Sequence, residues 1–160
     1  MGRRRNRLVI SSFFRKISGR RPSGYVCGDS FQKIIMERAD KRLERERSFT
    51  NHLFTIEDLA RLVGTNRTYL SQSIKMQKGM SFCSYINGWR IGYAKRYIEE
   101  KRKERSGGRI GRESGQLTTD DLAIICGFGS KRNFIRQFKQ RESVTPMQYI
   151  RKMEVSRFDG

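Results

Sequence analysis

The sequence predicts an all-α fold in which two helix-turn-helix subdomains are joined by a long linker helix. The first observation behind this prediction is a duplication: the stretch TIEDLARLVGTNRTYL from Thr55 is matched by TTDDLAIICGFGSKRNF from Thr118, with one extra residue after Gly127. The second is that each copy contains two short apolar helical patterns separated by a glycine, as in a helical hairpin. Because each copy of a repeat is normally one structural unit, the hairpin is expected twice.

Taken in order, the chain divides into six segments. We expect a basic arm at residues 1–30, the first subdomain at 31–81 and the linker helix at 82–105. A Gly-rich loop at 106–117, the second subdomain at 118–153 and a tail at 154–160 follow. The first subdomain opens with a helix over about residues 31–47, capped by Asp29 or Ser30, whose charged side chains form a solvated face. A loop over residues 48–54 follows. The apolar residues on or near one face of this helix are Phe31, Ile34, Ile35 and Leu43.

The first copy carries the start and stop signals of two helices. Thr55 is placed to cap the first helix, and Glu57 lies in its first turn, where the helix dipole favours negative charge. Gly64 supplies the turn that follows, and Asn66 or Thr65 caps the second helix. The inward face of that second helix is formed by Leu70 and Ile74.

The linker helix is predicted to begin after Ser81, its cap, and to run to about Arg105. About 19 to 24 residues at about 1.5 Å per residue give a length of about 28 to 36 Å, close to one turn of DNA at about 34 Å. If the two hairpins bind DNA, a helix of this length could place their second helices in successive major grooves. Its apolar residues recur at helical spacing and are Phe82, Tyr85, Ile86, Trp89 and Tyr93.

The second copy repeats these signals with changes. Phe128 places an aromatic side chain in the turn, where we expect it to fill the core. The last helix is predicted to start at Pro146 with Thr145 as its cap, because proline lacks an N–H that the first helical turn would leave unpaired. Residues 155–160 are expected to fray.

The charge balance indicates a polyanionic partner. The chain has 160 residues, and 35 Lys and Arg against 16 Asp and Glu leave a net charge of +19. Such a charge favours a nucleic acid first and an anionic membrane surface second. Cys27, Cys83 and Cys126 are odd in number and lack CxxC spacing, so free thiols in a reducing cytoplasm are the simplest interpretation.

Several other classes of protein are disfavoured. The apolar run from Leu8 to Phe14 is far shorter than the roughly 20 residues of a membrane span, and it lacks the features of a secretory signal. His52, the single histidine, has no ligand partner at a suitable spacing and is interpreted as a surface residue. Because the sequence shows no pattern of catalytic or metal-binding residues, we expect no enzyme activity, no cofactor, no metal and no small-molecule site.

Two sets of spaced residues give the chain a resemblance to a known family. In the first unit they are Leu59, Ala60, Gly64, Tyr69, Leu70, Ser71, Gly79, Met80, Ser81, Phe82, Tyr85, Ile86, Asn87, Arg90 and Ala94, and in the second Leu122, Ala123, Gly127, Phe128, Phe134, Phe138, Lys139, Val144, Thr145, Pro146 and Tyr149. From about Phe31 to Lys152 the chain resembles the DNA-binding domain of the AraC/XylS family of bacterial transcription regulators. Two features depart from the family pattern. Residues 106–117 form a longer connection, and Thr119 replaces an aliphatic residue, which should weaken the packing of the second unit.

The resemblance implies sequence-specific binding of double-stranded DNA in the major groove and regulation of transcription. Carried over by alignment, the DNA-binding residues are Arg67, Thr68, Ser71, Gln72 and Lys75 in the first recognition helix, and Lys131, Arg132, Asn133, Ile135 and Arg136 in the second. By its chemistry, Gln72 suits a bidentate contact to adenine, whereas Arg132 or Arg136 suits guanine. Ile135 suits a thymine methyl group, and Arg67 and Lys75 suit phosphates.

The resemblance also implies RNA polymerase and a sensor or dimerisation domain as partners. The arginine-rich arm is consistent with a longer parent protein tethered to a membrane, with the present chain in the cytoplasm. Two alternatives stay open: a nonspecific basic nucleic-acid-binding protein, and a membrane-associated protein that acts through its arm. The duplicated hairpins favour specific DNA binding, because neither alternative requires them.

Overall fold

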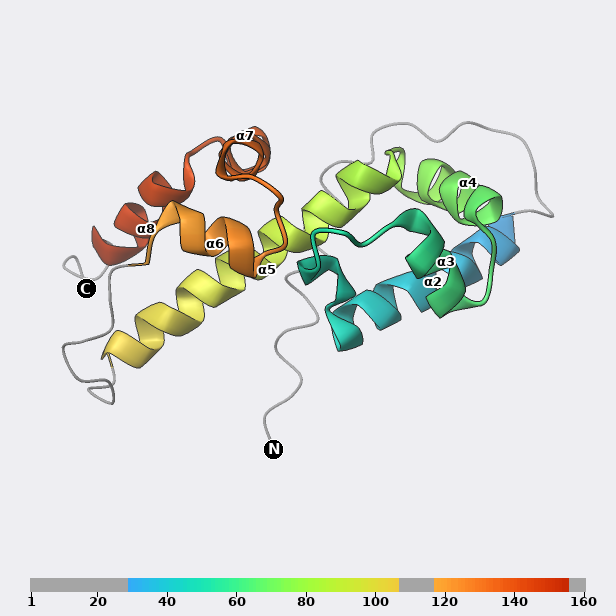
Figure 1. Ribbon diagram of the computed structural model, residues 1–160, viewed down its shortest axis with the longest axis horizontal. Coiled ribbons are helices and arrows are strands. Elements are labelled where there is room, and N and C mark those ends of the chain that lie inside the picture. The colour runs from blue at the N-terminus through green and yellow to red at the C-terminus, as the bar shows by residue number, and fades with distance from the viewer. Residues whose placement is uncertain (1–28, 107–116, 156–160) are drawn as a thin grey trace. The chain divides into compact units, whose positions relative to one another are not determined.

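The computed structural model describes residues 29–106 and 117–155, and within these ranges the protein is all-α without strands, as the sequence predicts (Figure 1). The helices are α2 (Asp29–Glu46), the 3-10 helix η1 (Ser48–Thr50), α3 (Ile56–Val63), α4 (Arg67–Lys78), α5 (Phe82–Ser106), α6 (Thr119–Ile125), α7 (Lys131–Glu142) and α8 (Pro146–Val155). Most of the expected arm, Gly-rich loop and tail lie outside the described residues. The chain forms two compact units that divide within α5.

Unit 1 comprises residues 29–49 and 53–89, and therefore contains α2, α3, α4 and the start of α5. α2 and α4 lie side by side and run in the same direction. The rings of Phe31 and Tyr69 contact each other near their first turns, with centroids 5.9 Å apart. Further along both helices, Lys78 Nζ lies 3.3 Å from Asp40 Oδ2. The buried hydrophobic residues of this unit are Ile35, Met36, Ala39, Leu43, Phe49, Leu59, Ala60, Val63, Leu70, Ile74, Tyr85, Ile86 and Trp89.

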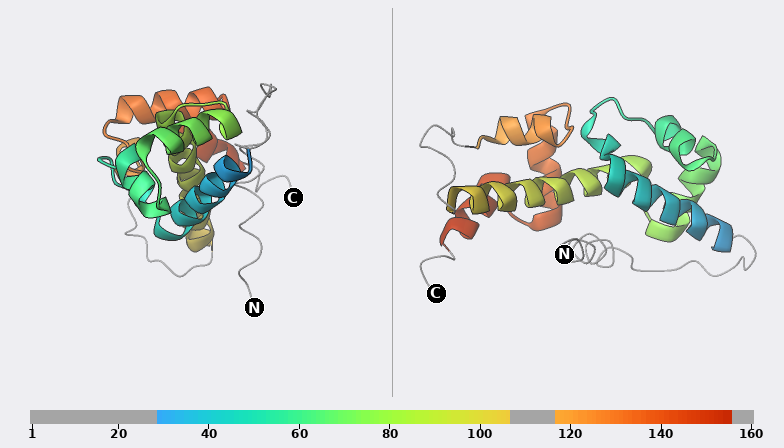
Figure 2. Two further views of the ribbon diagram at one scale, coloured as in Figure 1. Left: turned by 90° about the vertical axis from the view of Figure 1, so that its right-hand side faces the viewer. Right: turned by 90° about the horizontal axis from the view of Figure 1, so that it is seen from below.

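Unit 2 comprises residues 50–52, 90–106 and 117–155, and therefore contains the rest of α5 with α6, α7 and α8. α8 lies along the C-terminal half of α5 (Figures 1 and 2), where Arg102 Nη1 donates to the carbonyl oxygen of Met153 at 2.7 Å. Arg90 is buried and donates to the carbonyl oxygen of Asn51 at 3.0 Å. This bond ties residues 50–52 to unit 2. The buried core consists of Ile91, Ala94, Ile98, Leu122, Ala123, Cys126, Phe128, Phe134 and Phe138.

The predicted capping signals form. Thr55 and Thr118 each accept a hydrogen bond from the backbone of the third helical residue, and the carboxylates of Asp58 and Asp121 bond back to the two threonines. Because such a box satisfies orphan donors of the first turn, it fixes where each repeat begins. The cap between α3 and α4 is Asn66 rather than Thr65, since the side chain of Asn66 accepts from the backbone of α4.

The later elements also form as predicted. Ser81 Oγ accepts from the backbone N–H of Ser84 at 3.3 Å, and α5 ends within one residue of its expected end. Thr145 and Gln148 cap α8 reciprocally, with Pro146 as its first residue. Phe128 is buried, as a core-filling residue should be, and the expected surface residue His52 is exposed.

Three expectations about element boundaries and faces are wrong. The α2 helix already includes Asp29, which was expected to precede it as a cap. Its buried face includes Met36 and Ala39, whereas Phe31 and Ile34 are about half exposed. The apolar stripe that faces α3 and α4 therefore begins one turn later than expected. The expected loop over residues 48–54 contains η1, which buries Phe49 completely. α8 continues to Val155, inside the segment expected to be a frayed tail.

No helix in the described part of the chain is long and apolar enough to cross a membrane. The α5 helix reaches the necessary length, but charged residues fill its second half. The apolar run between residues 8 and 14 and the arginine-rich arm belong to residues 1–28, outside the described ranges.

Candidate nucleic-acid interface

The α4 helix has a buried face and an exposed polar face. Leu70 and Ile74 are completely buried, whereas Thr68, Ser71, Gln72 and Lys75 are exposed. At 3.6 residues per turn, the exposed residues follow one another at the spacing of a single helix face. Ser73, the buried polar residue of α4, donates to the carbonyl oxygen of Tyr69 at 2.8 Å. The polar groups of the exposed face have no side-chain partner within the described residues, so they can bond to an external ligand.

Both ends of α4 are fixed by local backbone geometry. Asn66 caps the N-terminus, with its Oδ1 accepting from the N–H of Tyr69 at 2.9 Å. Gly79 ends the helix at φ 68°, in the left-handed region that glycine adopts without the penalty of a Cβ atom. The exposed face therefore projects from a helix of defined length and orientation within unit 1.

The α7 helix repeats this arrangement with different side chains. Phe134 and Phe138 are completely buried, Ser130 caps the N-terminus, and Ser143 ends the helix at φ 62°. The exposed predicted residues are Lys131, Arg132 and Arg136, and Asn133 and Ile135 are partly buried.

One contact within α7 orients a predicted base-reading side chain. Arg136 Nη2 donates to Asn133 Oδ1 at 3.1 Å, one helical turn away. A single Nη hydrogen is used by this bond, so the guanidinium keeps other donors for a ligand. The bond keeps the Arg136 side chain next to Asn133 on the surface of α7.

An ion pair joins the two helices of the hairpin in each copy. Arg67 Nη1 lies 3.2 Å from Glu57 Oε1 in unit 1, and Lys131 Nζ lies 2.6 Å from Asp120 Oδ2 in unit 2. The four residues hold equivalent positions in the repeat. All four side chains are at least half exposed, so these pairs contribute little stability. They place a cation at the first residue of α4 and of α7.

The C-terminal end of α4 is held by a polar cluster. Asp40 of α2 accepts from the Tyr85 hydroxyl at 2.6 Å and lies 3.3 Å from Lys78 Nζ. Burial, followed by the nearby charge of Asp40, raises the pKa of Tyr85 well above its usual value, so its hydroxyl stays a donor.

The equivalent cluster in α7 has its charges exchanged. Glu142 holds the position of Lys78, and its Oε2 lies 2.8 Å from Lys95 Nζ of α5. Lys95 also lies over the ring of Tyr149, which is the counterpart of Tyr85, at 5.5 Å from the centroid. Burial raises the pKa of Tyr149 to about 12. In both units a charged pair and a tyrosine thus anchor the last turn of the recognition helix.

The structure places every predicted site residue on α4 or α7, and it shows one exposed cation that the predicted set omits. Lys139 lies in the last turn of α7 and is exposed. It is the counterpart of Lys75, so the alignment of the two repeats was the signal that could have identified it. Among the described residues, no group of three His, Cys, Asp or Glu side chains is arranged to hold a metal ion.

Two capped hairpins, each with an outward polar helix, define the class of helix-turn-helix domains. A family model described as "Helix-turn-helix domain" matches residues 59–152, more than half of the chain. The chain therefore belongs to the family of AraC-type helix-turn-helix domains. Members of this family are DNA-binding domains of transcription regulators, and this chain is such a domain.

A curated relative supports this assignment. Over 95 residues the chain is 30% identical to the uncharacterized HTH-type transcriptional regulator YtdP of Bacillus subtilis (strain 168). The alignment covers 59% of this chain and 10% of YtdP. The chain thus spans about a tenth of the length of this relative.

Solved structures share the fold. The DNA-binding domain of AdpA, a global transcriptional factor crystallised with a target DNA, matches with a TM-score of 0.56 and 19% identity over 79% of this chain and 97% of that chain. The C-terminal domain of the response regulator AraT from Geobacillus stearothermophilus matches with a TM-score of 0.53 and 23% identity, over 74% of this chain and 84% of that chain.

Proposed function

We propose that this chain regulates transcription by binding specific DNA sequences through α4 and α7, each placed in a major groove. One observation carries the proposal: both helices turn a row of exposed polar or cationic side chains outward while the opposite face is fixed in a core. The major groove admits a helix and presents a distinct hydrogen-bonding pattern for each base pair. The target DNA bound to the similarly folded AdpA domain supports this mode of binding.

In unit 1 the reading residues are neutral hydrogen-bonding side chains. Gln72 pairs in bidentate fashion with adenine N6 and N7, and Thr68 and Ser71 bond to neighbouring base edges or phosphates. Arg67 and Lys75 flank this row at the two ends of the exposed face and bind phosphates. Arg67 exchanges its exposed pairing with Glu57 for a phosphate at small cost, because that surface pair is weak.

In unit 2 the reading residues are cationic or apolar. Arg132 and Arg136 are the candidates for guanine O6 and N7, and the contact from Asn133 favours Arg136 because it restricts that side chain before DNA arrives. Ile135 packs against a thymine methyl group. Lys131 and Lys139 bind phosphates at either end of α7.

The broader biological setting follows from the same proposal. A regulator of this kind acts on RNA polymerase, either directly or by occupying its site, and acts in the cytoplasm where the DNA lies. Because the chain matches only a tenth of the YtdP relative, we propose that a sensor or dimerisation domain, and in the parent protein a membrane anchor, complete the regulator.

The deciding experiment is selection of bound sequences from a random duplex library at about 150 mM salt, followed by affinity measurements on the recovered motif and a scrambled duplex. We expect a motif with two patches, at least about 10³-fold preferred over scrambled DNA. The spacing between the patches then measures the separation of the two reading helices on DNA.

The same experiment tests the alternatives. Tight, strongly salt-dependent binding without sequence enrichment would show that the charge of +19 dominates, and the proposal of specific recognition would be rejected. Binding to anionic vesicles that is lost on deletion of residues 1–23 would instead favour a membrane-surface protein.

A further inference from the structure

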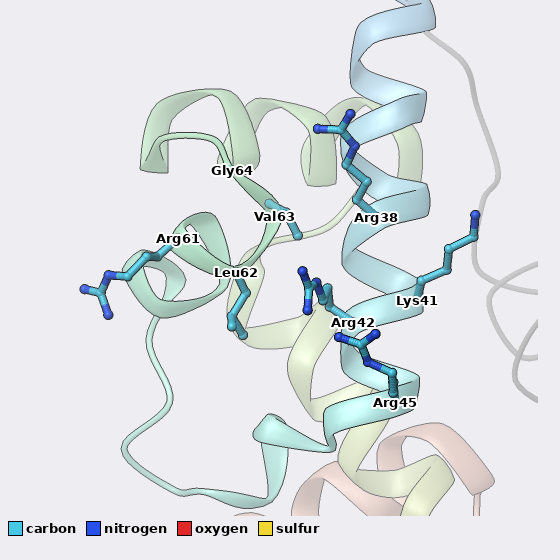
Figure 3. A pocket seen from close by; sticks show the side chains of 8 residues that line it. All are labelled: Arg38, Lys41, Arg42, Arg45, Arg61, Leu62, Val63 and Gly64. Carbon is cyan, nitrogen blue, oxygen red and sulfur yellow. The ribbon is translucent and has the colours of Figure 1, made fainter.

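A hollow in unit 1 collects five cationic side chains from two helices (Figure 3). It lies between the C-terminal half of α2 and the end of α3 and has a volume of about 570 Å³. None of its lining residues in the described part of the chain is acidic. They are Arg38, Lys41, Arg42 and Arg45 from α2, Arg61 from α3, and Leu62, Val63 and Gly64. Like charges gathered at one concave surface raise the local concentration of anions.

The protein neutralises this cluster only in part. Arg42 and Arg45 share the single carboxylate of Glu46, at 2.7 and 3.0 Å, and the pKa of Glu46 is lowered by its hydrogen bonds to these two arginines. Arg61 lies 3.4 Å from a carboxylate oxygen of Asp58. That carboxylate also belongs to the capping box of α3.

The two remaining cations have no such partner. Arg38 and Lys41 are exposed and have no acidic side chain within ion-pair distance among the described residues. The cluster therefore sets five cations against two carboxylates. In Figure 3 the side chains of Arg38, Arg42 and Arg45 extend toward the hollow, whereas those of Lys41 and Arg61 extend away from it at its edges.

The hollow is separate from the surface of α4 that faces DNA in the proposed function. None of its lining residues belongs to α4. Leu70 and Ile74 of α4 are buried in unit 1, and Gln72 is two residues, or about 200°, from each of them around the helix. The predicted reading face of α4 thus points away from the residues on which α4 packs, and it shares no residue with the hollow.

We propose that this pocket binds a small polyphosphate, meaning a free ligand with at least two linked phosphate groups. Planar guanidinium groups pair with phosphate oxygens in bidentate fashion, and four of the five cations are arginines. The volume lies in the range of small-molecule sites. Leu62 and Val63 add an apolar wall against which a sugar or base can pack. The sequence alone predicts a solvated face on α2 and no small-molecule site, whereas the hollow formed where α2 meets α3 supports a different proposal.

The test measures binding of sodium tripolyphosphate to the complete 160-residue chain by calorimetry at low salt and at about 150 mM salt, with orthophosphate as the low-charge comparison. We expect tripolyphosphate to bind at one site per chain and to raise Tm, whereas orthophosphate binds at least tenfold more weakly. The double variant Arg38→Gln/Lys41→Gln should weaken tripolyphosphate binding by about tenfold, because two of the five cations that line the hollow are lost.

The matched control removes the same charge elsewhere. Lys33→Gln/Arg151→Gln replaces two exposed cations that do not line the pocket, and it should change the affinity less than twofold. All four positions are exposed, so unchanged circular dichroism and Tm without ligand should accompany each variant.

Three results would overturn the proposal. An equal loss of tripolyphosphate affinity in the two double variants would show that the net charge of the chain alone attracts the ligand. An acidic peptide such as hexaglutamate that binds as tightly as tripolyphosphate, with the same dependence on Arg38 and Lys41, would indicate a protein partner. Loss of affinity for a selected duplex in Arg38→Gln/Lys41→Gln, without any tripolyphosphate binding, would assign these residues to DNA. Because the main readout uses no DNA, its outcome is independent of the proposed function.

Discussion

The two units share a framework but differ in the surface that this framework presents. Thr55 and Thr118 begin the repeats with the same capping box, and both recognition helices are twelve residues long and end in the left-handed region. On the outward faces, however, Gln72 of α4 corresponds to Arg136 of α7. The Thr–Asp capping box is therefore the same in both units, the caps of the recognition helices keep their geometry with different residues, and the exposed positions differ in chemistry. We infer that the units read different bases with the same geometry.

Their interiors differ as well. Unit 2 contains a continuous row of four aromatic rings with successive centroids 5.1, 5.7 and 5.5 Å apart. At the matching positions of α4, unit 1 has the aliphatic Leu70 and Ile74, and its aromatic contact between Phe49 and Trp89 joins η1 to α5 instead. The same hairpin is therefore supported by two kinds of packing. The row in unit 2 consists of Phe128, Phe134, Phe138 and Tyr149.

The largest effect is expected from truncating this aromatic row. Phe138→Ala should lower the free energy of unfolding by about 3–5 kcal/mol, because the ring is completely buried between Phe134 and Tyr149. Ile74→Val at the matching position of unit 1 should cost only about 0.5–1.5 kcal/mol. Urea denaturation followed by circular dichroism measures both. A cost below about 1 kcal/mol for Phe138→Ala would mean that the aromatic row does not stabilise unit 2.

The difference between the outward faces can be tested base by base. Gln72→Ala and Arg136→Ala should each remove about 1–3 kcal/mol of discrimination at one base pair, the first at an adenine and the second at a guanine of the other patch. The measurement is the affinity of each variant for a set of duplexes with single base-pair changes in the selected motif.

Two controls separate reading from electrostatic attraction. Lys75→Ala should weaken binding to all duplexes alike and reduce the salt slope by about one. Arg151→Ala, on the exposed part of α8, should leave base preference unchanged. If Arg136→Ala weakened cognate and scrambled DNA equally, Arg136 would be a phosphate contact, and Arg132 would become the candidate for guanine.

Local signals were the part of the fold that the sequence could predict. Thr55, Asn66 and Gly64 act on neighbours within a few residues, so their roles could be read directly. Because the sequence repeats, the same kinds of signal could also be predicted for the second unit. The α2 face was assigned wrongly because Phe31 and Ile34 are strongly apolar yet about half exposed, whereas the small Ala39 is completely buried.

Features made by distant residues lay beyond sequence reasoning. Asp40 meets Tyr85 across 45 positions, and the arginines of α2 meet Arg61 only once α3 has folded onto that helix. The residues of the candidate DNA interface were reached through the family resemblance. Eight of the ten are exposed on α4 or α7, Asn133 and Ile135 are partly buried, and their individual base contacts stay predictions.

The exchanged charges at the ends of the recognition helices offer a direct test of equivalence. Lys78→Glu should destabilise unit 1 by about 1–2 kcal/mol, because Asp40 then loses a cation and gains a like charge in a partly buried place. Adding Asp40→Lys recreates the arrangement of Lys95 and Glu142, and it should restore much of the lost free energy of unfolding.

A double-mutant cycle on urea denaturation measures this coupling. We expect the exchanged pair Lys78→Glu/Asp40→Lys to recover only part of the stability, because the buried hydroxyl of Tyr85 loses its acceptor, Asp40 Oδ1. Tyr85→Phe in the exchanged background should therefore recover further stability. A coupling free energy of zero between positions 40 and 78 would show that the two clusters are similar in composition but do not stabilise their helices in the same way.

The smallest effects are expected at the two capping boxes. Thr55→Ala and Thr118→Ala should each cost about 1 kcal/mol, and similar costs would confirm that the boxes are equivalent. The hydrogen bond from the threonine side chain is the main cause that lowers the pKa of Asp58, and Thr118 does the same for Asp121. Arg61 lowers the pKa of Asp58 further, and Asp121 has no such cation.

The pH dependence of these boxes has a definite sign. Because both folded-state pKa values lie below the usual value for aspartate, about 3.9, the unfolded chain takes up protons first as the pH falls. The stabilisation is therefore complete above about pH 5 and is lost as the pH falls through the folded-state pKa values. Unfolding measured between pH 7 and pH 3 should show this decline, and Asp58→Asn should flatten it more than Asp121→Asn because Asp58 also interacts with Arg61. An equal flattening would mean that the exposed ion pair between Arg61 and Asp58 adds no stabilisation of its own.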